Sequence, residues 1–188
     1  MKDNLGREIT YLRLSVTDLC NLRCIYCMPE CGIKKMRHSD ILSIEEIESI
    51  VRASAACGIE KVRLTGGEPL VRKGIIDICR RIASIEGIRE ICLTTNGVLL
   101  PKYAKELYAS GVRKLNISLD TFDPEKYRML SRIGTLNDAL DGLKAAQDAG
   151  FESIKINVVL MGGINDDEIG KFVELTRDND ISVRFIEL

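Results

Sequence analysis

Six strand-like segments alternate with helical segments along this chain, and no other feature of the sequence constrains the fold as strongly. Runs rich in valine, isoleucine, leucine and threonine occur at residues 11–17, 61–65, 90–95, 114–119, 154–160 and 182–187. Each interval between two runs contains a segment with helical periodicity. Strands that alternate with helices predict an α/β fold with a parallel sheet and right-handed crossovers.

The length of the chain narrows the choice of architecture. A complete eight-stranded TIM barrel takes about 250 residues, whereas this chain has 188 residues. We therefore expect one domain over residues 1–188, built as an open, six-stranded, TIM-like partial barrel. A doubly wound flat sheet is the structural alternative.

The helices between the strands are expected to begin at recognisable capping residues. Ser43 and Glu46 form a capping box ahead of a helix that ends near Gly58. A second helix is expected from about residue 73 to residue 84. Further helix starts are predicted at Pro101, at Asp123-Pro124, near Leu136, and at Asn165 with Glu168.

The strands have two different faces, because side chains alternate between the two sides with a period of two. One face is apolar, with residues such as Leu14, Leu64 and Ile117, and is expected to meet the helices. The other face is polar and carries several cations, which are expected to point into the barrel together with a single carboxylate. Burial of unpaired cations is unfavourable, so these cations predict a cavity that binds an anionic ligand. An amphipathic sheet with a solvated face is the alternative. The residues concerned are Arg13, Lys61, Arg63, Lys155 and Arg184, facing Asp120.

Three cysteines with the spacing C-x3-C-x2-C follow the first strand: Cys20, Cys24 and Cys27. Thiolates this close in sequence bind iron–sulfur clusters or zinc. Three ligands for a [4Fe–4S] cluster leave one iron open, and an open iron can bind a substrate or cofactor. Two alternatives remain: a zinc site, although zinc favours two separated cysteine pairs, and a four-cysteine electron carrier that adds Cys31.

Composition excludes several other kinds of function. The net charge is −1 and no basic run stands out, so a surface for nucleic acid or anionic membrane has no support. Neither a stretch of about 18 apolar residues nor an apolar signal region is found, which predicts a cytoplasmic protein. His38 is the single histidine, and a histidine-based triad is not expected. Three other cysteines are expected to be small core residues without a function: Cys57, Cys79 and Cys92.

Several segments together resemble the radical S-adenosylmethionine (SAM) enzymes and, within that superfamily, the lyases that cyclise GTP in molybdenum cofactor biosynthesis. The resemblance implies a six-stranded partial barrel, a [4Fe–4S] cluster and SAM, whose cleavage gives a 5′-deoxyadenosyl radical. It further implies that this radical abstracts the 3′ hydrogen of GTP, that C3′ then bonds to C8, and that an electron donor is needed. The segments are Gly6-Arg7, Leu12 to Asp18, Cys20 to Pro29, and Thr65-Gly66-Gly67-Glu68-Pro69.

The same resemblance implies roles for individual residues. Cys20, Cys24 and Cys27 would bind the cluster. Tyr26, Gly67 and Ser118 would contact SAM, and the alternatives are a packing aromatic for Tyr26 and a bare turn at Gly66-Gly67. No phosphate-binding P-loop motif is present, so side-chain cations would hold the triphosphate. The GTP contacts implied are Arg13, Arg63, Thr94 and Lys155, with a weaker match at Arg184.

The resemblance also implies that the chain is truncated. Enzymes of that family continue beyond the sixth strand with a second three-cysteine cluster that binds guanine, whereas this chain ends at Leu188. We expect the chain to hold one cluster and cleave SAM slowly, without cyclising GTP. Other radical SAM reactions, such as peptide maturation, and a non-catalytic iron–sulfur or zinc module remain open, as does the choice between monomer and homodimer.

Overall fold

All six strands belong to one parallel sheet, in which the spatial order follows the chain from β1 to β6. The structure is a computed structural model that describes residues 2–34, 36–37 and 40–187, so His38 lies outside the described residues. Consecutive strand order confirms the predicted partial barrel, because a doubly wound sheet reverses its strand order. The strands are β1 (Tyr11–Ser15), β2 (Lys61–Thr65), β3 (Glu90–Thr95), β4 (Val112–Ser118), β5 (Ser153–Leu160) and β6 (Ile181–Glu187).

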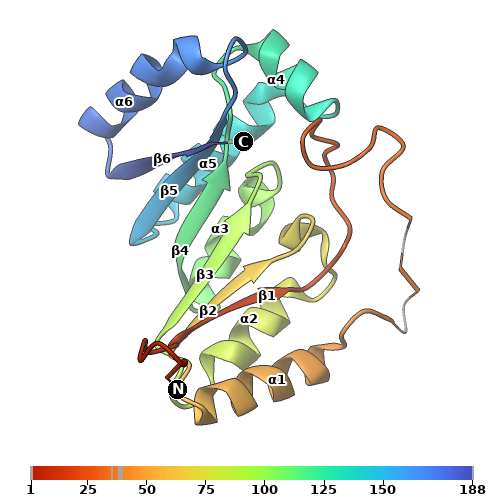
Figure 1. Cartoon of the computed structure of the whole chain (residues 1–188), viewed down its shortest axis with the longest axis vertical. Coiled ribbons are helices and arrows are strands. Elements are labelled where there is room, and N and C mark those ends of the chain that lie inside the picture. Colours follow the sequence, from red (N-terminus) through yellow and green to blue (C-terminus); the bar gives the residue numbers. More distant parts are fainter. Residues whose placement is uncertain (1, 35, 38–39, 188) are drawn as a thin grey trace.

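Helices fill the crossovers between successive strands, and β1 and β6 form the two edges of the open sheet (Figure 1). The long connection from β1 to α1 passes beside α4 before it returns to α1 (Figure 1). The helices are α1 (Ile44–Ala56), η2 (Pro69–Val71), α2 (Ile75–Ala83), α3 (Leu100–Ala109), α4 (Pro124–Ser131), α5 (Leu136–Asp148), η3 (Asp166–Glu168) and α6 (Ile169–Arg177).

The predicted capping residues start most of these helices. At α1, the Ser43 hydroxyl accepts the Glu46 N–H at 3.1 Å, and the Glu46 carboxylate accepts the Ser43 N–H at 2.7 Å. The Asp123 carboxylate caps α4 by accepting the N–H groups of Glu125 and Lys126. Each cap satisfies N–H groups that have no partner inside the helix, which places the helix starts where the sequence predicts them.

The predicted helix start at Asn165 and Glu168 is wrong in its detail. Asn165 does not cap a helix with its side chain, and a short 3₁₀ turn, η3, precedes α6. The Asn165 amide instead donates to the carbonyls of Asp120 at 2.8 Å and Val159 at 2.9 Å. Glu168 is buried and accepts the hydroxyl of Thr121. Both residues therefore join the end of β4 to its neighbours, a long-range role that local helix signals do not reveal.

The apolar face of the sheet forms the core with the helices. Val62, Leu64 and Leu115 have no exposed surface, and burial of such a side chain contributes roughly 1.5–3 kcal/mol. Within the described residues, no helix is both long and apolar enough to cross a membrane.

Two of the three isolated cysteines occupy the core as expected. Cys79 and Cys92 are fully buried, whereas Cys57 is exposed at the end of α1. The prediction for Cys57 is wrong because α1 buries the face of Ile47 and Val51, and a residue six positions after Val51 lies well away from that face.

Candidate active site

The loop that carries Cys20, Cys24 and Cys27 lies at the carboxyl ends of the strands. Cys20 and Cys24 are half-buried and Cys27 is exposed. The Cys24 carbonyl accepts the N–H groups of Cys27 at 2.9 Å and Met28 at 3.1 Å, which closes a turn between the second and third cysteines. Parallel α/β folds bind ligands at this end of the sheet, so the loop has the position that a cofactor site needs.

The three thiols are near enough to affect one another's charge. Burial raises the pKa of Cys20, and burial followed by the charges of Asp120 and the other two thiolates raises the pKa of Cys24 to about 11. A bound cation would offset this accumulation of negative charge. In the described ranges no three His, Cys, Asp or Glu side chains are already arranged as a metal site. The donor set itself, three soft thiolates in one loop, fits an iron–sulfur cluster.

The Gly66-Gly67 turn after β2 lets the cysteine loop approach closely. A Cβ at Gly67 would lie 2.3 Å from the Leu19 carbonyl oxygen, and one at Gly66 would lie 2.6 Å from that of Thr17. The Gly67 N–H donates to the Thr17 carbonyl at 2.8 Å. The turn therefore docks the loop onto β2, and a SAM contact at Gly67 stays a prediction.

Glu68, which the sequence analysis did not select, organises the next part of the site. Its carboxylate is 1% exposed and accepts the Leu70 N–H at 3.0 Å, the Thr95 hydroxyl at 2.8 Å and the Asn96 N–H at 2.7 Å. Burial raises the pKa of Glu68, and the hydrogen bonds oppose this rise. The Asn96 amide in turn lies 3.9 Å from the sulfur of Cys20. In the sequence, the signal for Glu68 was its position between Gly66-Gly67 and Pro69.

Tyr26 connects the cysteine loop to the end of β4. Its hydroxyl donates to an Asp120 carboxylate oxygen at 2.6 Å, while the other oxygen accepts the Val159 N–H at 2.8 Å. Burial raises the pKa of both Tyr26 and Asp120. Tyr26 and Ser118 also line a cavity of about 40 Å³ together with Cys24. Two of the three residues predicted to contact SAM thus lie together beside Cys24, and Gly67 does not line that cavity.

The end of α4 provides a further anchor for the loop. The Arg23 N–H donates to the Ser131 carbonyl at 3.0 Å. Arg132 donates to the carbonyls of Arg23 at 3.1 Å and Met28 at 3.0 Å. Its backbone φ of 59° is in the left-handed region, which is unfavourable for a residue with a side chain.

The inner face of the sheet brings the predicted GTP residues onto one surface. Arg13 lies beside Arg63 in the strand register, and the Arg63 guanidinium donates to the Thr94 hydroxyl at 3.4 Å. Lys155 lies on the same face, where burial, and then the charges of Arg184 and other cations, lower its pKa. Four cations of this face form no ion pair with any described residue: Arg13, Arg63, Lys155 and Arg184.

The prediction that these cations face Asp120 alone is wrong. Glu90, at the start of β3, forms ion pairs with both Lys61 and Lys114. Burial opposes ionisation of Glu90, but the hydrogen bonds from the two lysines prevail and lower its pKa to about 2. Lys114 lies on this face through the same period of two as Asn116 and Ser118, and the strand register pairs it with Cys92, two residues after Glu90. Lys61 is therefore neutralised and does not belong to the free cations.

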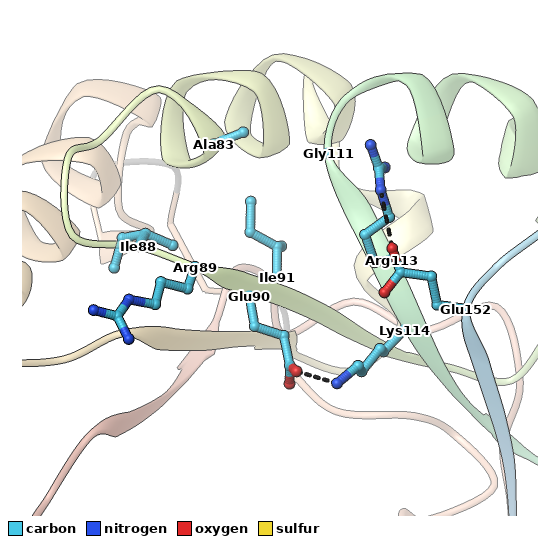
Figure 2. A pocket seen from close by; sticks show the side chains of 9 residues that line it. All are labelled: Ala83, Ile88, Arg89, Glu90, Ile91, Gly111, Arg113, Lys114 and Glu152. Carbon is cyan, nitrogen blue, oxygen red and sulfur yellow. Dashed lines mark hydrogen bonds and ion pairs between the residues drawn. The ribbon is translucent and has the colours of Figure 1, made fainter.

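The Glu90 group lies at the opposite end of the barrel from the cysteine loop. Figure 2 shows Glu90 and Lys114 at the amino ends of β3 and β4, beside the ion pair of Arg113 with Glu152. These residues line a cavity of about 390 Å³. None of the predicted site residues lies there. We therefore expect the paired charges at this end of the barrel to contribute to stability and not to ligand binding.

Comparisons with known proteins agree with this geometry. The family model described as "Radical SAM superfamily" matches residues 14–176. A curated protein of Peptoclostridium acidaminophilum named GTP 3′,8-cyclase is 56% identical over 99% of this chain and 57% of its own length. The protein of the same name in Geobacter sulfurreducens is 57% identical over 98% of this chain and 57% of its length. The chain thus spans little more than half the length of these relatives.

Solved structures show the same fold at low sequence identity. SuiB of Streptococcus suis, solved bound to S-adenosylmethionine, is 20% identical and superposes with a TM-score of 0.70 over 94% of this chain and 39% of SuiB. That likeness concerns the fold alone. Because the family model covers most of the residues, including the cysteine loop and the strands β2 to β5, this chain belongs to the radical SAM superfamily.

Proposed function

We propose that this chain is the radical SAM core domain of a GTP 3′,8-cyclase. Membership in the superfamily implies a [4Fe–4S] cluster and SAM. The name GTP 3′,8-cyclase, carried by relatives that are 56% and 57% identical, supports GTP as the substrate. The reaction would join C3′ to C8 of GTP in molybdenum cofactor biosynthesis and would require an electron donor.

The cluster would be held by Cys20, Cys24 and Cys27. The chemistry that the cluster would supply, with SAM bound, is reductive cleavage of SAM to a 5′-deoxyadenosyl radical. The turns at Gly67 and Asn96 hold the loop at Cys20, and Tyr26 fixes the segment between Cys24 and Cys27 to Asp120. A loop anchored at both ends holds its sulfurs in place with little loss of conformational freedom when the cluster binds.

SAM would lie against Tyr26, Gly67 and Ser118. Tyr26 and Ser118 lie near each other and near Cys24, so a molecule bound beside Cys24 would be within reach of both, although the cavity of about 40 Å³ that they share is itself too small to hold SAM. Since the Tyr26 hydroxyl is engaged by Asp120 at 2.6 Å, the ring and not the hydroxyl would face the adenine. Gly67 has its N–H committed to Thr17, so its carbonyl is the group available to the amino group of SAM.

The unpaired cations of the inner face are the single observation that favours GTP most. A triphosphate carries several negative charges, and guanidinium groups match phosphate oxygens with paired hydrogen bonds. Burial, and after it the repulsion of neighbouring cations, lowers the pKa of Lys155, and phosphate binding would relieve that repulsion. Thr94 would add a hydroxyl contact, while Arg63 is already oriented by the Tyr11 hydroxyl at 2.7 Å. The residues concerned are Arg13, Arg63, Thr94, Lys155 and Arg184.

This assignment is tested by measuring the equilibrium binding of GTP to two variants, Arg63→Ala and Lys61→Ala. We expect Arg63→Ala to weaken GTP binding about ten- to hundred-fold, because a hydrogen bond to a charged group contributes about 1.5–3 kcal/mol. Formation of 5′-deoxyadenosine from SAM without GTP should be unchanged in this variant, since the Arg63 guanidinium bonds to Tyr11 and Thr94 on the sheet.

Lys61→Ala is the matched control, because Lys61 lies on the same face but is already paired with Glu90. Its GTP affinity should change less than threefold. An equal loss of GTP affinity in both variants would contradict the proposed site and indicate general attraction by a positive surface. Loss of 5′-deoxyadenosine formation in Arg63→Ala would instead show that Arg63 belongs to the SAM site.

A further inference from the structure

Tyr127 on α4 carries a hydroxyl that the described structure leaves without a partner. The residue is 5% exposed, and its hydroxyl oxygen is fully buried with no hydrogen bond to any described group. Buried tyrosine hydroxyls nearly always find a partner. An unsatisfied buried hydroxyl is destabilising, so this hydroxyl indicates a hydrogen-bond acceptor that the iron-free structure does not bring within reach.

Tyr127 lines the cavity that lies under the cysteine loop. The cavity measures about 40 Å³, and Cys24, Ser118 and Asp120 form other parts of its wall. A water molecule occupies about 30 Å³ in the liquid. The space is therefore too small for SAM or GTP, but it allows a sulfur or a hydroxyl to move by a short distance toward its neighbour.

Most polar groups on the wall are already engaged. The two carboxylate oxygens of Asp120 accept the Tyr26 hydroxyl at 2.6 Å and the Val159 N–H at 2.8 Å. The Ser131 hydroxyl donates to the backbone carbonyl of Tyr127 at 2.7 Å. Asn96 and Thr121 are likewise bonded to other groups. Among the polar side chains of this wall, the Ser118 hydroxyl and the sulfur of Cys24 are the acceptors that have no hydrogen bond to a described group.

Cys24 is the stronger acceptor of the two once it is deprotonated. A cysteine that binds iron does so as a thiolate, whereas a serine hydroxyl stays neutral. A phenol keeps its proton at neutral pH and can donate it to a hydrogen bond. The unpartnered Tyr127 hydroxyl and Cys24 belong to the wall of the same small cavity.

We propose that the Tyr127 hydroxyl donates a hydrogen bond to the sulfur of Cys24 when Cys24 binds the cluster, and that this bond raises the reduction potential of the cluster. Hydrogen bonds to cluster sulfurs stabilise the reduced, more negative state. The inference rests on the proposed role of Cys24 as a cluster ligand. It makes Tyr127 a positioning residue that acts on the cluster through one of its ligands.

A redox titration of Tyr127→Phe tests the inference. The full chain is reconstituted anaerobically with iron and sulfide, and the reduced cluster is followed by electron paramagnetic resonance without SAM. We expect an unchanged iron content and a lower midpoint potential. At a fixed potential the ratio of reduced to oxidised cluster should fall about three- to ten-fold, and tenfold corresponds to about 59 mV for one electron.

Thermal unfolding of the iron-free chain provides a second, independent reading. Tyr127→Phe removes a hydroxyl that has no partner in the iron-free state, so its midpoint temperature should equal or exceed that of the unchanged chain. A clear decrease would show that the hydroxyl is bonded to Ser118 or to water without the cluster, which would overturn the inference.

Tyr108→Phe is the matched control, because Tyr108 is partly buried against Phe151 at a ring distance of 5.7 Å, at the far end of the barrel. Its midpoint potential should not change. An unshifted potential in Tyr127→Phe with normal iron content would refute the hydrogen bond and leave the cluster assignment standing. Absence of iron from the unchanged chain would refute both, and the iron assay separates the two failures.

Discussion

Glu90 shows how one carboxylate decides which cations of the inner face are free. It pairs with Lys61 and Lys114, which are both about one-third exposed. Without Glu90, six cations would share this face with no acid at its amino end, and their repulsion would oppose folding. The carboxylate thus stabilises one end of the sheet and leaves the other cations for a ligand.

Replacement of Glu90 should change stability in a pH-dependent way. Its pKa is lowered to about 2 from an ordinary value of 4.5. A carboxyl with a depressed pKa contributes stability above its unfolded pKa, and this contribution is lost as the pH falls toward 2. Glu90→Gln should therefore lower the free energy of unfolding by about 1–2 kcal/mol at pH 7, with a difference that shrinks between pH 4.5 and pH 2.

Urea unfolding across that pH range measures the effect. Glu60→Gln serves as the control, because the Glu60 pair with Arg89 is exposed and 3.4 Å long, and such pairs contribute about 0–1 kcal/mol. A constant difference between Glu90→Gln and the unchanged chain from pH 7 to pH 2.5 would show that ionisation of Glu90 is not involved.

Individual site residues could be predicted from the sequence only where a motif or a period determines them. The cysteines follow from their spacing, and the inward direction of Arg63 and Lys155 follows from the period of two. The period of two also places Glu90 and Lys114 on the inner face, but their ion pair depends on how β3 and β4 align, which includes a register irregularity between Ile91 and Cys92. Glu68 and Tyr127 were missed because their importance lies in burial, which depends on elements far away in the sequence.

At the scale of elements, the cysteine loop depends on α4 as much as on the strands. Arg132 bridges from the end of α4 to two loop carbonyls, and its φ of 59° costs conformational energy. A left-handed backbone is tolerated well only by glycine and, less well, by asparagine or aspartate. The unfavourable backbone conformation therefore occurs at a residue, Arg132, whose side chain holds the cysteine loop.

Two substitutions at this residue separate the backbone from the side chain. Arg132→Gly and Arg132→Ala both remove the bonds to the loop, so both should lose iron faster to a chelator than the unchanged chain. Only glycine removes the backbone cost, so Arg132→Gly should be more stable to urea than Arg132→Ala by about 1 kcal/mol. Equal stability of the two variants, or iron loss in Arg132→Ala alone, would contradict this interpretation.

Element positions were predicted more reliably than the contacts between elements. Capping residues such as Ser43 and Asp123 act locally, and both begin the predicted helices. Asn165 carries the same local signal but bonds to Asp120 and Val159. A cap and a tether between strands use the same side-chain chemistry, and only the tertiary structure distinguishes them.

For the whole molecule, consecutive strand order places all carboxyl ends of the sheet at one end of the barrel. The cysteine loop and the turns at Gly67, Asn96 and Asp120 meet there, and the unpaired cations line the inner face below. The alternation of strands and helices predicts this parallel arrangement. The curvature that makes a partial barrel depends on strand twist and packing, which single segments of sequence do not specify.

Formation of 5′-deoxyadenosine tests most directly whether three cysteines hold a cluster with an open iron for SAM. The reconstituted chain, Cys24→Ala and Cys31→Ala are each incubated anaerobically with SAM and a reductant, and the product is quantified. We predict product from the unchanged chain and from Cys31→Ala, and none from Cys24→Ala. Loss of product and cluster in Cys31→Ala, or a complete cluster that yields no 5′-deoxyadenosine, would contradict the three-ligand site.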